Sequence, residues 1–409
     1  MKRVVIIGGG AAGLMAAKAA ADGGHDVTVV EKNGRPARKM MITGKGRCNV
    51  TNNADVKTLV GAVTGNGRFL YSAFNMFSAD DTVRFFEDMG VPLKTERGGR
   101  VFPCSDRAAD IVDALVKAVT KSGARIMCDR VTDIDVKDGA VKGVVTASGL
   151  RIPADAVIVA TGGMSYPSTG STGDGYEFAR KTGHSIVPVR PSLVPLTVAE
   201  GWCSALQGLS LKNVNVSLYK ENEKKTIYSE LGEMMFTHFG LTGPEILSAS
   251  AFIDDPKSEK YKIVIDMKPA LSEEKLDARI VRDFSKYSNR DYINSLCDLL
   301  PKKMVPTAVK LSGIEPSQKV NQITKEQRER LVHTLKNLTL HVTGTRPIDE
   351  AIVTKGGVDL RCIDPKTMQS KQVSGLYFAG EVMDADAFTG GFNLQIAFST
   401  GYAAGSAIK

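Results

Sequence analysis

The first 31 residues constrain the fold more than any other part of the chain. Residues 2–7, KRVVII, form a β-branched run that predicts a buried strand of a parallel sheet. An Ala-rich stretch at 14–22 predicts a helix, and DVTVVE at 26–31 predicts a second strand. The sequence GGGAAG at 8–13 connects the first strand to the helix. This β-α-β order, with glycines at the strand-to-helix turn, is typical of a dinucleotide-binding unit.

The spacing of the glycines gives each of them a separate role. Gly8 permits the tight turn, Gly10 lets the backbone approach a pyrophosphate, and Gly13 lets the helix pack on the strand. The N-terminus of the helix supplies N–H donors and partial positive charge. Glu31 ends the second strand, where an acid accepts hydrogen bonds from a ribose diol.

Composition places the chain among soluble globular proteins of two or three domains. It has 409 residues, 43% of them hydrophobic and 24% charged. No segment approaches the ~20 apolar residues of a membrane span, and no signal-peptide pattern opens the chain, so we expect a cytoplasmic protein. The net charge of +8 is compatible with an anionic ligand.

The six cysteines do not indicate metal or disulfide chemistry. None of them forms C-x-x-C, and no histidine cluster accompanies them. We therefore expect no metal site and reduced thiols.

The C-terminal region favours FAD over NAD as the bound dinucleotide. A strand ends in Ala379-Gly380-Glu381, and a Gly-Gly turn at 390–391 leads into a final helix. FAD enzymes of the glutathione-reductase class use such an acid at the ribityl chain and point such a helix at the flavin, where its positive end stabilises the reduced ring. The run VIVATGG at 157–163 fits a further buried strand of that class. No second G-x-G-x-x-G follows a strand, so NAD(P)H is expected only as a transient reductant, or the protein is an oxidase.

These patterns predict an α/β protein with a split, Rossmann-like FAD-binding domain of the glutathione-reductase class. The domain is expected at 1–190 and 347–409. Alternating segments predict a β-rich, barrel-like insert at 191–270 and 337–346, and helix-spaced apolar residues predict a small helical insert at 271–336.

Several blocks together resemble the BaiN/YhiN-like family of FAD-dependent oxidoreductases. They are the Gly fingerprint, TGKGRCNVTN at 43–52, GGRVFP at 98–103, VIVATGGMSYPSTGSTGDG at 157–175, FTHFGLTGP at 236–244, AIVTKGGVD at 351–359 and AGEVMDADAFTGGFNLQIAFSTG at 379–401. The resemblance covers nearly the whole chain and implies the fold and FAD. The family includes a reductase of 3-oxo-Δ4,6 bile acids, a ribosomal-RNA dihydrouridine synthase and an aminoacetone oxidase, so it leaves the substrate open.

The resemblance also implies which residues hold FAD. Those expected at the ADP half are Ala11, Ala12, Glu31 and Lys32, with Val131 at the adenine and Thr161 and Gly162 closing over the nucleotide. Those expected along the pyrophosphate and flavin are Lys39, Gly44, Gly46, Cys48 and Asn49, with Lys45 and Arg47 balancing phosphate charge. Those expected at the flavin end are Gly380, Glu381, Asn393 and Leu394.

Reduction of a conjugated C=C bond also needs a proton donor and an electrophile for the carbonyl. Tyr166, His238 and Lys355 are the catalytic candidates, although the simpler roles are a turn residue for Tyr166, a structural residue for His238 and a surface residue for Lys355. Cys48 is a further proton-donor candidate, and packing against the cofactor is its simpler role.

The expected function is reduction of conjugated C=C bonds with NAD(P)H, with an apolar 3-oxo-Δ4/Δ4,6 steroid (a bile acid) as the favoured substrate. An rRNA dihydrouridine synthase, an amine-type flavin oxidase and a flavin-bound protein without turnover are the alternatives. Residues 271–336 carry 13 basic and 9 acidic residues, a small excess that gives RNA only weak support.

Overall fold

The computed structural model describes residues 1–254 and 258–409 and divides them into two compact units. Unit 1 comprises Met1–Ser192 and Pro347–Lys409, and unit 2 comprises Leu193–Arg346. The fold class predicted from the sequence is confirmed: a discontinuous Rossmann-like domain carries an inserted closed barrel with helices. The further division of the insert at 271 and 336 stays a prediction.

A parallel sheet forms the centre of unit 1. Its five described strands lie in the order β19-β10-β1-β2-β6 and pair in parallel throughout. The strands are β1 (Arg3–Ile7), β2 (Asp26–Glu31), β6 (Arg125–Cys128), β10 (Ala156–Val159) and β19 (Leu376–Phe378). The valines and isoleucines of β1, β2 and β10 are almost fully buried because helices cover both faces of such a sheet.

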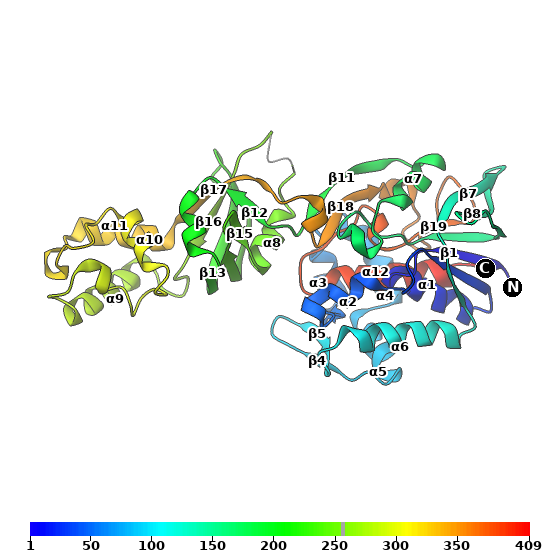
Figure 1. The fold of residues 1–409 in the computed structure, drawn as a ribbon, viewed down its shortest axis with the longest axis horizontal. Helices are drawn as coiled ribbons and strands as arrows, with labels where there is room; N and C mark the ends of the chain where they lie inside the picture. The colour runs from blue at the N-terminus through cyan, green and yellow to red at the C-terminus, as the bar shows by residue number, and fades with distance from the viewer. Residues whose placement is uncertain (255–257) are drawn as a thin grey trace. The chain divides into compact units, whose positions relative to one another are not determined.

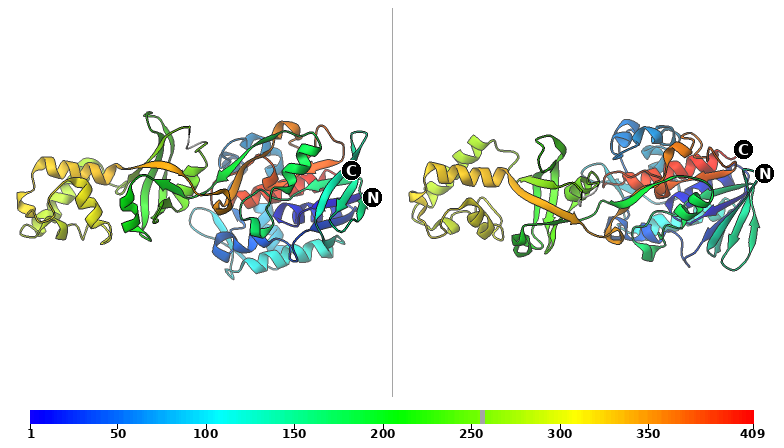
Figure 2. Two further views of the ribbon diagram at one scale, coloured as in Figure 1. Left: turned by 45° about the horizontal axis from the view of Figure 1, so that its top comes forward. Right: turned by 90° about the horizontal axis from the view of Figure 1, so that it is seen from above.

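The first and last helices of the chain pack closely against each other in unit 1. The blue α1 (Ala11–Asp22) and the red α12 (Phe392–Ser406) lie side by side in every view (Figures 1 and 2). A Cβ on Gly401 would lie 2.3 Å from the carbonyl oxygen of Ala12, and one on Gly405 would lie 2.4 Å from that of Ala16. The glycines of α12 therefore allow backbone contact that brings both helix N-termini to one end of the sheet.

Smaller elements complete unit 1. Two three-stranded antiparallel sheets have the orders β3-β5-β4 and β7-β8-β9, and β11 pairs with β18. These strands are β3 (Thr51–Asn52), β4 (Leu93–Thr95), β5 (Arg100–Pro103), β7 (Val131–Lys137), β8 (Ala140–Thr146), β9 (Arg151–Pro153), β11 (Ile186–Ser192) and β18 (Val353–Val358). The remaining helices are α2 (Arg38–Ile42), α3 (Val56–Gly61), α4 (Tyr71–Met76), α5 (Ala79–Asp88), α6 (Ala108–Lys121) and α7 (Asp174–Lys181).

Unit 2 combines a closed barrel with a group of helices. The described strands close in the order β12-β15-β14-β13-β16-β17. They are β12 (Leu196–Val198), β13 (Ser210–Lys220), β14 (Thr226–Phe236), β15 (Gly240–Thr242), β16 (Tyr261–Asp266) and β17 (Leu338–Thr345). The helices are α8 (Pro244–Ser250), α9 (Glu273–Lys286), α10 (Val305–Ser312) and α11 (Lys325–Lys336), with α9 to α11 grouped together in Figure 1. In the part of the chain that the structure describes, no helix is long and apolar enough to cross a membrane.

Candidate functional site

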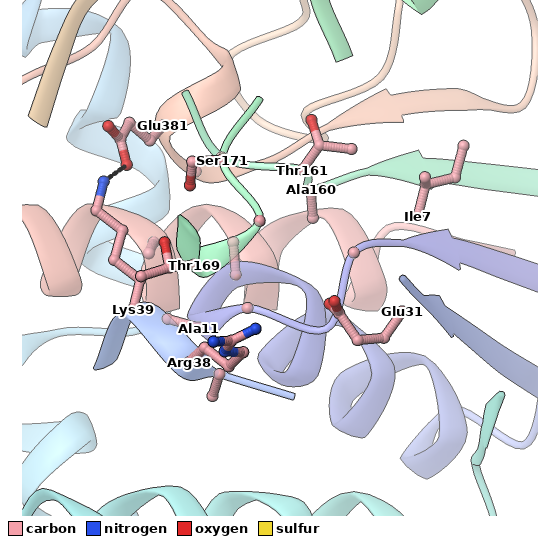
Figure 3. A pocket seen from close by; sticks show the side chains of 18 of the residues that line it. Ile7, Ala11, Glu31, Arg38, Lys39, Ala160, Thr161, Thr169, Ser171 and Glu381 are labelled. Carbon is pink, nitrogen blue, oxygen red and sulfur yellow. Dashed lines mark hydrogen bonds and ion pairs between the residues drawn. The ribbon is translucent and has the colours of Figure 1, made fainter. Parts of the chain in front are cut away.

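A pocket in unit 1 opens at the carboxyl ends of the parallel strands. Its walls come from the turn between β1 and α1, the end of β2, the start of α2, the segment after β10, and the first turn of α12. Figure 3 shows these side chains converging from elements that are far apart in sequence. In open α/β sheets this crevice is where nucleotides bind.

The glycine turn after β1 is shaped for close approach from the pocket. A Cβ on Gly8 would lie 2.7 Å from the Ala160 carbonyl oxygen, and one on Gly13 would lie 1.9 Å from the Gly8 carbonyl oxygen. Gly10, in contrast, has no heavy atom within 4 Å of a built Cβ, and it lines the pocket. No side chain caps the N-terminus of α1. Its first N–H groups are therefore left to a ligand or to solvent, as at pyrophosphate sites.

Glu31 holds the turn in place at the end of β2. Only 7% of the residue is exposed. Its Oε2 accepts a hydrogen bond from the Gly9 N–H at 2.7 Å, and its Oε1 accepts bonds from the Asn33 N–H and side-chain amide, both at 2.8 Å. A carboxylate with these donors is fixed in orientation, with further lone pairs available for a ribose.

Lys32 and Asp174 form a charged pair at the wall beside Glu31. Lys32 Nζ lies 2.9 Å from Asp174 Oδ2, and Arg130 Nη2 lies 3.2 Å from Asp174 Oδ1. Burial opposes ionisation of Asp174, but the hydrogen bond from Lys32 and the two positive charges hold its pKa below the ordinary value. Asp174 therefore stays ionised at neutral pH.

Lys39 and Glu381 form a second charged pair at the other end of the pocket. Lys39 Nζ donates to Glu381 Oε2 at 2.7 Å and to Ser165 Oγ at 2.6 Å, and Figure 3 marks the ion pair with Glu381. Glu381 Oε1 accepts bonds from Ser165 Oγ at 3.1 Å and from the Thr354 N–H at 2.9 Å. Ser165 is fully buried. The arrangement fixes an ammonium group and a carboxylate at the pocket wall.

Three buried polar side-chain atoms of unit 1 have no hydrogen-bond partner in the part of the chain that the structure describes. Within residues 1–254 and 258–409, Asn49 Oδ1 and Thr161 Oγ1 are buried without a hydrogen bond, as is Tyr176 Oη. Thr161 lines the pocket. Because an unpaired buried polar atom costs free energy, the Thr161 hydroxyl at the pocket wall fits a site that a polar ligand completes.

Most of the residues expected to hold FAD line this pocket. They are Gly8, Gly10, Ala11, Ala12, Glu31, Lys32, Lys39, Val131, Thr161, Gly162, Gly380, Glu381, Asn393 and Leu394. Seven others do not line it: Gly13, Gly44, Lys45, Gly46, Arg47, Cys48 and Asn49. Their contact with a cofactor stays a prediction.

The catalytic candidates are not among the residues that line the pocket. Tyr166 follows Ser165 and has a positive φ of 49°, and its N–H donates to the Asp349 carbonyl oxygen. Lys355 lies within β18, two residues before its Gly357. His238 belongs to unit 2 and is exposed, with its ring against Phe239. Their roles stay predictions.

The loop at 43–50 is a tightly wound segment of unit 1. Gly44, Gly46 and Cys48 all have positive φ, at 57°, 84° and 61°. Arg47 pairs with Glu96 at 2.8 Å and Asp106 at 3.2 Å, so its charge is balanced within the chain instead of being left for a phosphate.

The ionisation of the Cys48 thiol does not suit a proton donor. The residue is fully buried, and burial raises the pKa of its thiol to about 12. Such a thiol stays protonated and releases its proton with difficulty, which fits the packing role.

Sequence reasoning gave no cofactor role to Ser165, Asn33, Asp174 or Thr354. Ser165 lies six residues after the end of β10, and Asn33 lies two residues after Glu31, the last residue of β2. Their position beyond the carboxyl ends of parallel strands was the signal available for them. Asp174 and Thr354 reach the site from α7 and β18, and no local pattern marks them.

Comparison with known proteins gives the family. The model of the HI0933-like protein Rossmann domain matches residues 2–407. The chain belongs to this family. It is 32% identical to the 3-dehydro-bile acid delta(4,6)-reductase of Clostridium scindens, over 100% of this chain and 99% of that protein. It is 33% identical to the ribosomal RNA dihydrouridine synthase of Haemophilus influenzae, over 99% and 98% of the two chains.

Solved structures support the fold. A 3-ketosteroid-Δ4-(5α)-dehydrogenase from Rhodococcus jostii has a TM-score of 0.55, with 15% identity over 99% of this chain and 96% of that chain. A 3-ketosteroid Δ1-dehydrogenase from Sterolibacterium denitrificans has a TM-score of 0.53, with 13% identity over 99% and 98%. At these identities the likeness concerns the fold and not the substrate.

Proposed function

We propose that this protein is an FAD-dependent oxidoreductase that reduces a C=C bond conjugated to a carbonyl, with NAD(P)H as reductant. One observation carries the proposal. The glycine turn, the ribose-side carboxylate Glu31 and the first turn of α12 meet in one pocket of an HI0933-like chain. The curated relatives support the reaction class, because a Δ4,6-reductase and a dihydrouridine synthase both add hydrogen to such a bond.

The residues of the pocket suit FAD at both of its ends. The uncapped N-terminus of α1 receives the pyrophosphate and Glu31 the adenosine ribose, while Lys39, Glu381 and α12 receive the flavin end. The chemistry that FAD would supply when held there is hydride transfer between a nicotinamide and the β-carbon of the substrate.

The chain's own part in the reaction is to orient the substrate and to supply a proton. The α-carbon gains that proton, and a donor to the carbonyl oxygen stabilises the charge that develops there. Tyr166, Lys355 and His238 are the proposed sources.

A 3-oxo-Δ4,6 steroid and a uracil base of RNA are the two substrate candidates. The first follows the expectation from the sequence and the full-length similarity to the Clostridium reductase. The second has two full-length relatives, at 33% and 30% identity, and one structural observation that favours it, a hollow lined by basic residues in unit 2.

Anaerobic reduction tests the reaction class. The FAD-loaded protein is mixed with NADH or NADPH, and bleaching of the flavin is followed. The reduced protein is then mixed with a 3-oxo-Δ4 bile acid or an rRNA fragment, and the products are analysed for two added hydrogen atoms. Apoprotein is the control.

Reoxidation by either substrate, with the hydrogenated product, supports the proposal and chooses between the candidates. Failure of both nicotinamides to reduce the flavin would refute it. Reoxidation by oxygen alone, with peroxide formed, would also refute it and would indicate an oxidase.

A further inference from the structure

A surface hollow lies among the helices of unit 2. Its lining comes from the segment around η5 (Tyr292–Asn294), the start of α10, and Lys319 just before η6 (Val320–Gln322). The lining residues are Arg290, Asp291, Ile293, Asn294, Cys297, Lys302, Val305, Pro306 and Lys319. The hollow lies in a different unit from the dinucleotide pocket.

Backbone pairing makes one rim of this hollow rigid. The Tyr292 N–H donates to the Gln318 carbonyl oxygen at 2.9 Å, and the Val320 N–H donates to the Arg290 carbonyl oxygen at 3.1 Å. Asp291 and Lys319 form an antiparallel β-bridge between these bonds. The cations on this rim are thus carried by hydrogen-bonded backbone and not by a loose loop.

The charge of the hollow is positive. Arg290, Lys302 and Lys319 line it, and Asp291 is the one acid among its lining residues. The Asp291 carboxylate is already paired with Lys319 at 2.8 Å. Arg290 and Lys302 are exposed and have no carboxylate within 4.0 Å among residues 1–254 and 258–409. Two unbalanced cations therefore face solvent at one hollow.

An aromatic ring supports one of these cations. The Arg290 guanidinium lies 4.4 Å from the centre of the Tyr287 ring. The Tyr287 hydroxyl donates to Asp298 Oδ2 at 2.7 Å, which holds the ring in place. A guanidinium held on a ring in this way offers a planar cation to phosphates and to unstacked bases, as in RNA-binding proteins.

We propose that this hollow, defined by Arg290, Lys302 and Lys319, is a docking site for RNA, which contacts it through phosphates and one stacked base. The inference rests on the proposed function with a uracil base of RNA as the substrate, and it extends that function. RNA binds here as a polyanion outside the dinucleotide pocket, so that affinity depends on unit 2 while reduction depends on unit 1. The two unbalanced cations and the ring-supported guanidinium of Arg290 distinguish this surface from one for an acidic peptide, which needs charge but no stacking partner.

Binding of a fluorescent single-stranded rRNA fragment to the full, FAD-loaded protein tests the site. The variant R290E/K302E is compared with K224E/K225E, which makes the same charge change at exposed lysines between β13 and β14. Flavin content and melting temperature show whether each variant is folded. Anisotropy is measured from about 50 to 200 mM salt, the range over which phosphate contacts weaken strongly.

We expect R290E/K302E to lose roughly 10- to 100-fold in affinity and about 1.4 units of salt slope, the value for two single-strand phosphate contacts. The control is expected to bind within about two-fold of the unchanged protein, once screening reduces its general charge effect. R290K should keep the salt slope and lose the stacking part of the affinity.

Three results would overturn the site. They are no RNA binding by the unchanged protein, equal losses in R290E/K302E and K224E/K225E, and an unchanged salt slope in R290E/K302E. None of them bears on reduction of the flavin by NAD(P)H or on turnover of an enone. Failure of the docking site and failure of the reductase are therefore distinguishable.

Discussion

The ammonium group of Lys39 lies 2.7 Å from Oε2 of Glu381, although 342 positions separate the two residues. Both side chains are largely shielded, with 23% and 19% exposed. The bond connects α2, from the first part of the chain, with η9 (Gly380–Val382), from the last part. The pair therefore joins the two sequence segments of unit 1 at the wall of the pocket.

Removing the Lys39 charge should weaken both the fold of unit 1 and its hold on FAD. Lys39→Met leaves the Glu381 carboxylate in a shielded position without its cation, which costs about 1–3 kcal/mol. We expect a lower melting temperature of the apoprotein and about ten-fold weaker FAD binding in a fluorescence titration. Lys18→Met, which removes a surface pair with Asp22, is the matched control and should change neither. Equal effects of the two variants would contradict the prediction.

The glycine turn predicts opposite outcomes for two neighbouring substitutions. Gly13→Ala puts a Cβ 1.9 Å from the Gly8 carbonyl oxygen, so the helix must shift, at a cost of about 1–3 kcal/mol or more. Gly10→Ala meets no atom within 4 Å and keeps a φ of −81°, so the apoprotein should remain stable. Its methyl group faces the pocket, and FAD binding should weaken. Thermal melting with and without FAD separates the two effects. A Gly13→Ala protein as stable as the unchanged one would contradict the close contact between Gly13 and the Gly8 carbonyl oxygen.

The raised pKa of the buried Asp386 carboxyl predicts that stability depends on pH. Its carboxyl is 4% exposed, and burial raises its pKa above the ordinary 3.8, against the bonds from Ser192 and Thr64. As pH rises, the unfolded chain releases this proton at a lower pH than the folded chain does. The free energy of unfolding therefore falls as pH rises from about 4 through the folded pKa. Asp386→Asn removes this titration, so its stability relative to the unchanged protein should grow over that window. Melting curves from pH 4 to 7 check this, and a difference independent of pH would contradict it.

The rate of alkylation should differ between exposed and buried cysteines. Cys48 is buried with a thiol pKa raised to about 12, whereas Cys104, Cys128 and Cys297 are exposed. Because the thiolate is the reactive form, iodoacetamide at pH 8 should modify the exposed cysteines quickly and Cys48 only after unfolding. Mass spectrometry of peptides identifies the modified residues. Rapid labelling of Cys48 in the folded protein would show that the loop at 43–50 opens.

The sequence predicts the pocket where its signals are local. The β-α-β unit, the glycine turn and Glu31 lie within one stretch of 31 residues, and their spacing determines their placement. The Lys39–Glu381–Ser165 contacts escape such reasoning because three distant segments meet only after the sheet has formed. Arg47 shows the same limit: its acids, Glu96 and Asp106, lie about 50 positions away, as their bonds record.

The hollow in unit 2 was beyond sequence reasoning for a related reason. Counting charges over 271–336 averages the paired Lys319 with the unpaired Arg290 and Lys302. The backbone pairing of residues 290–292 with 318–320 places Arg290 and Lys319 on one rim, and Lys302 lines the same hollow from the segment before α10.

The chain passes from unit 1 to unit 2 after Ser192 and returns after Arg346, and the strand pairing at these two points has an evolutionary consequence. Ser192 pairs with Val353 in β11 and β18, and Leu196 pairs with Thr345 in β12 and β17. The outgoing and returning strands are thus neighbours within each unit, as at sites where inserted domains are tolerated. A lineage can therefore lengthen, shorten or exchange the insert without rebuilding the nucleotide pocket.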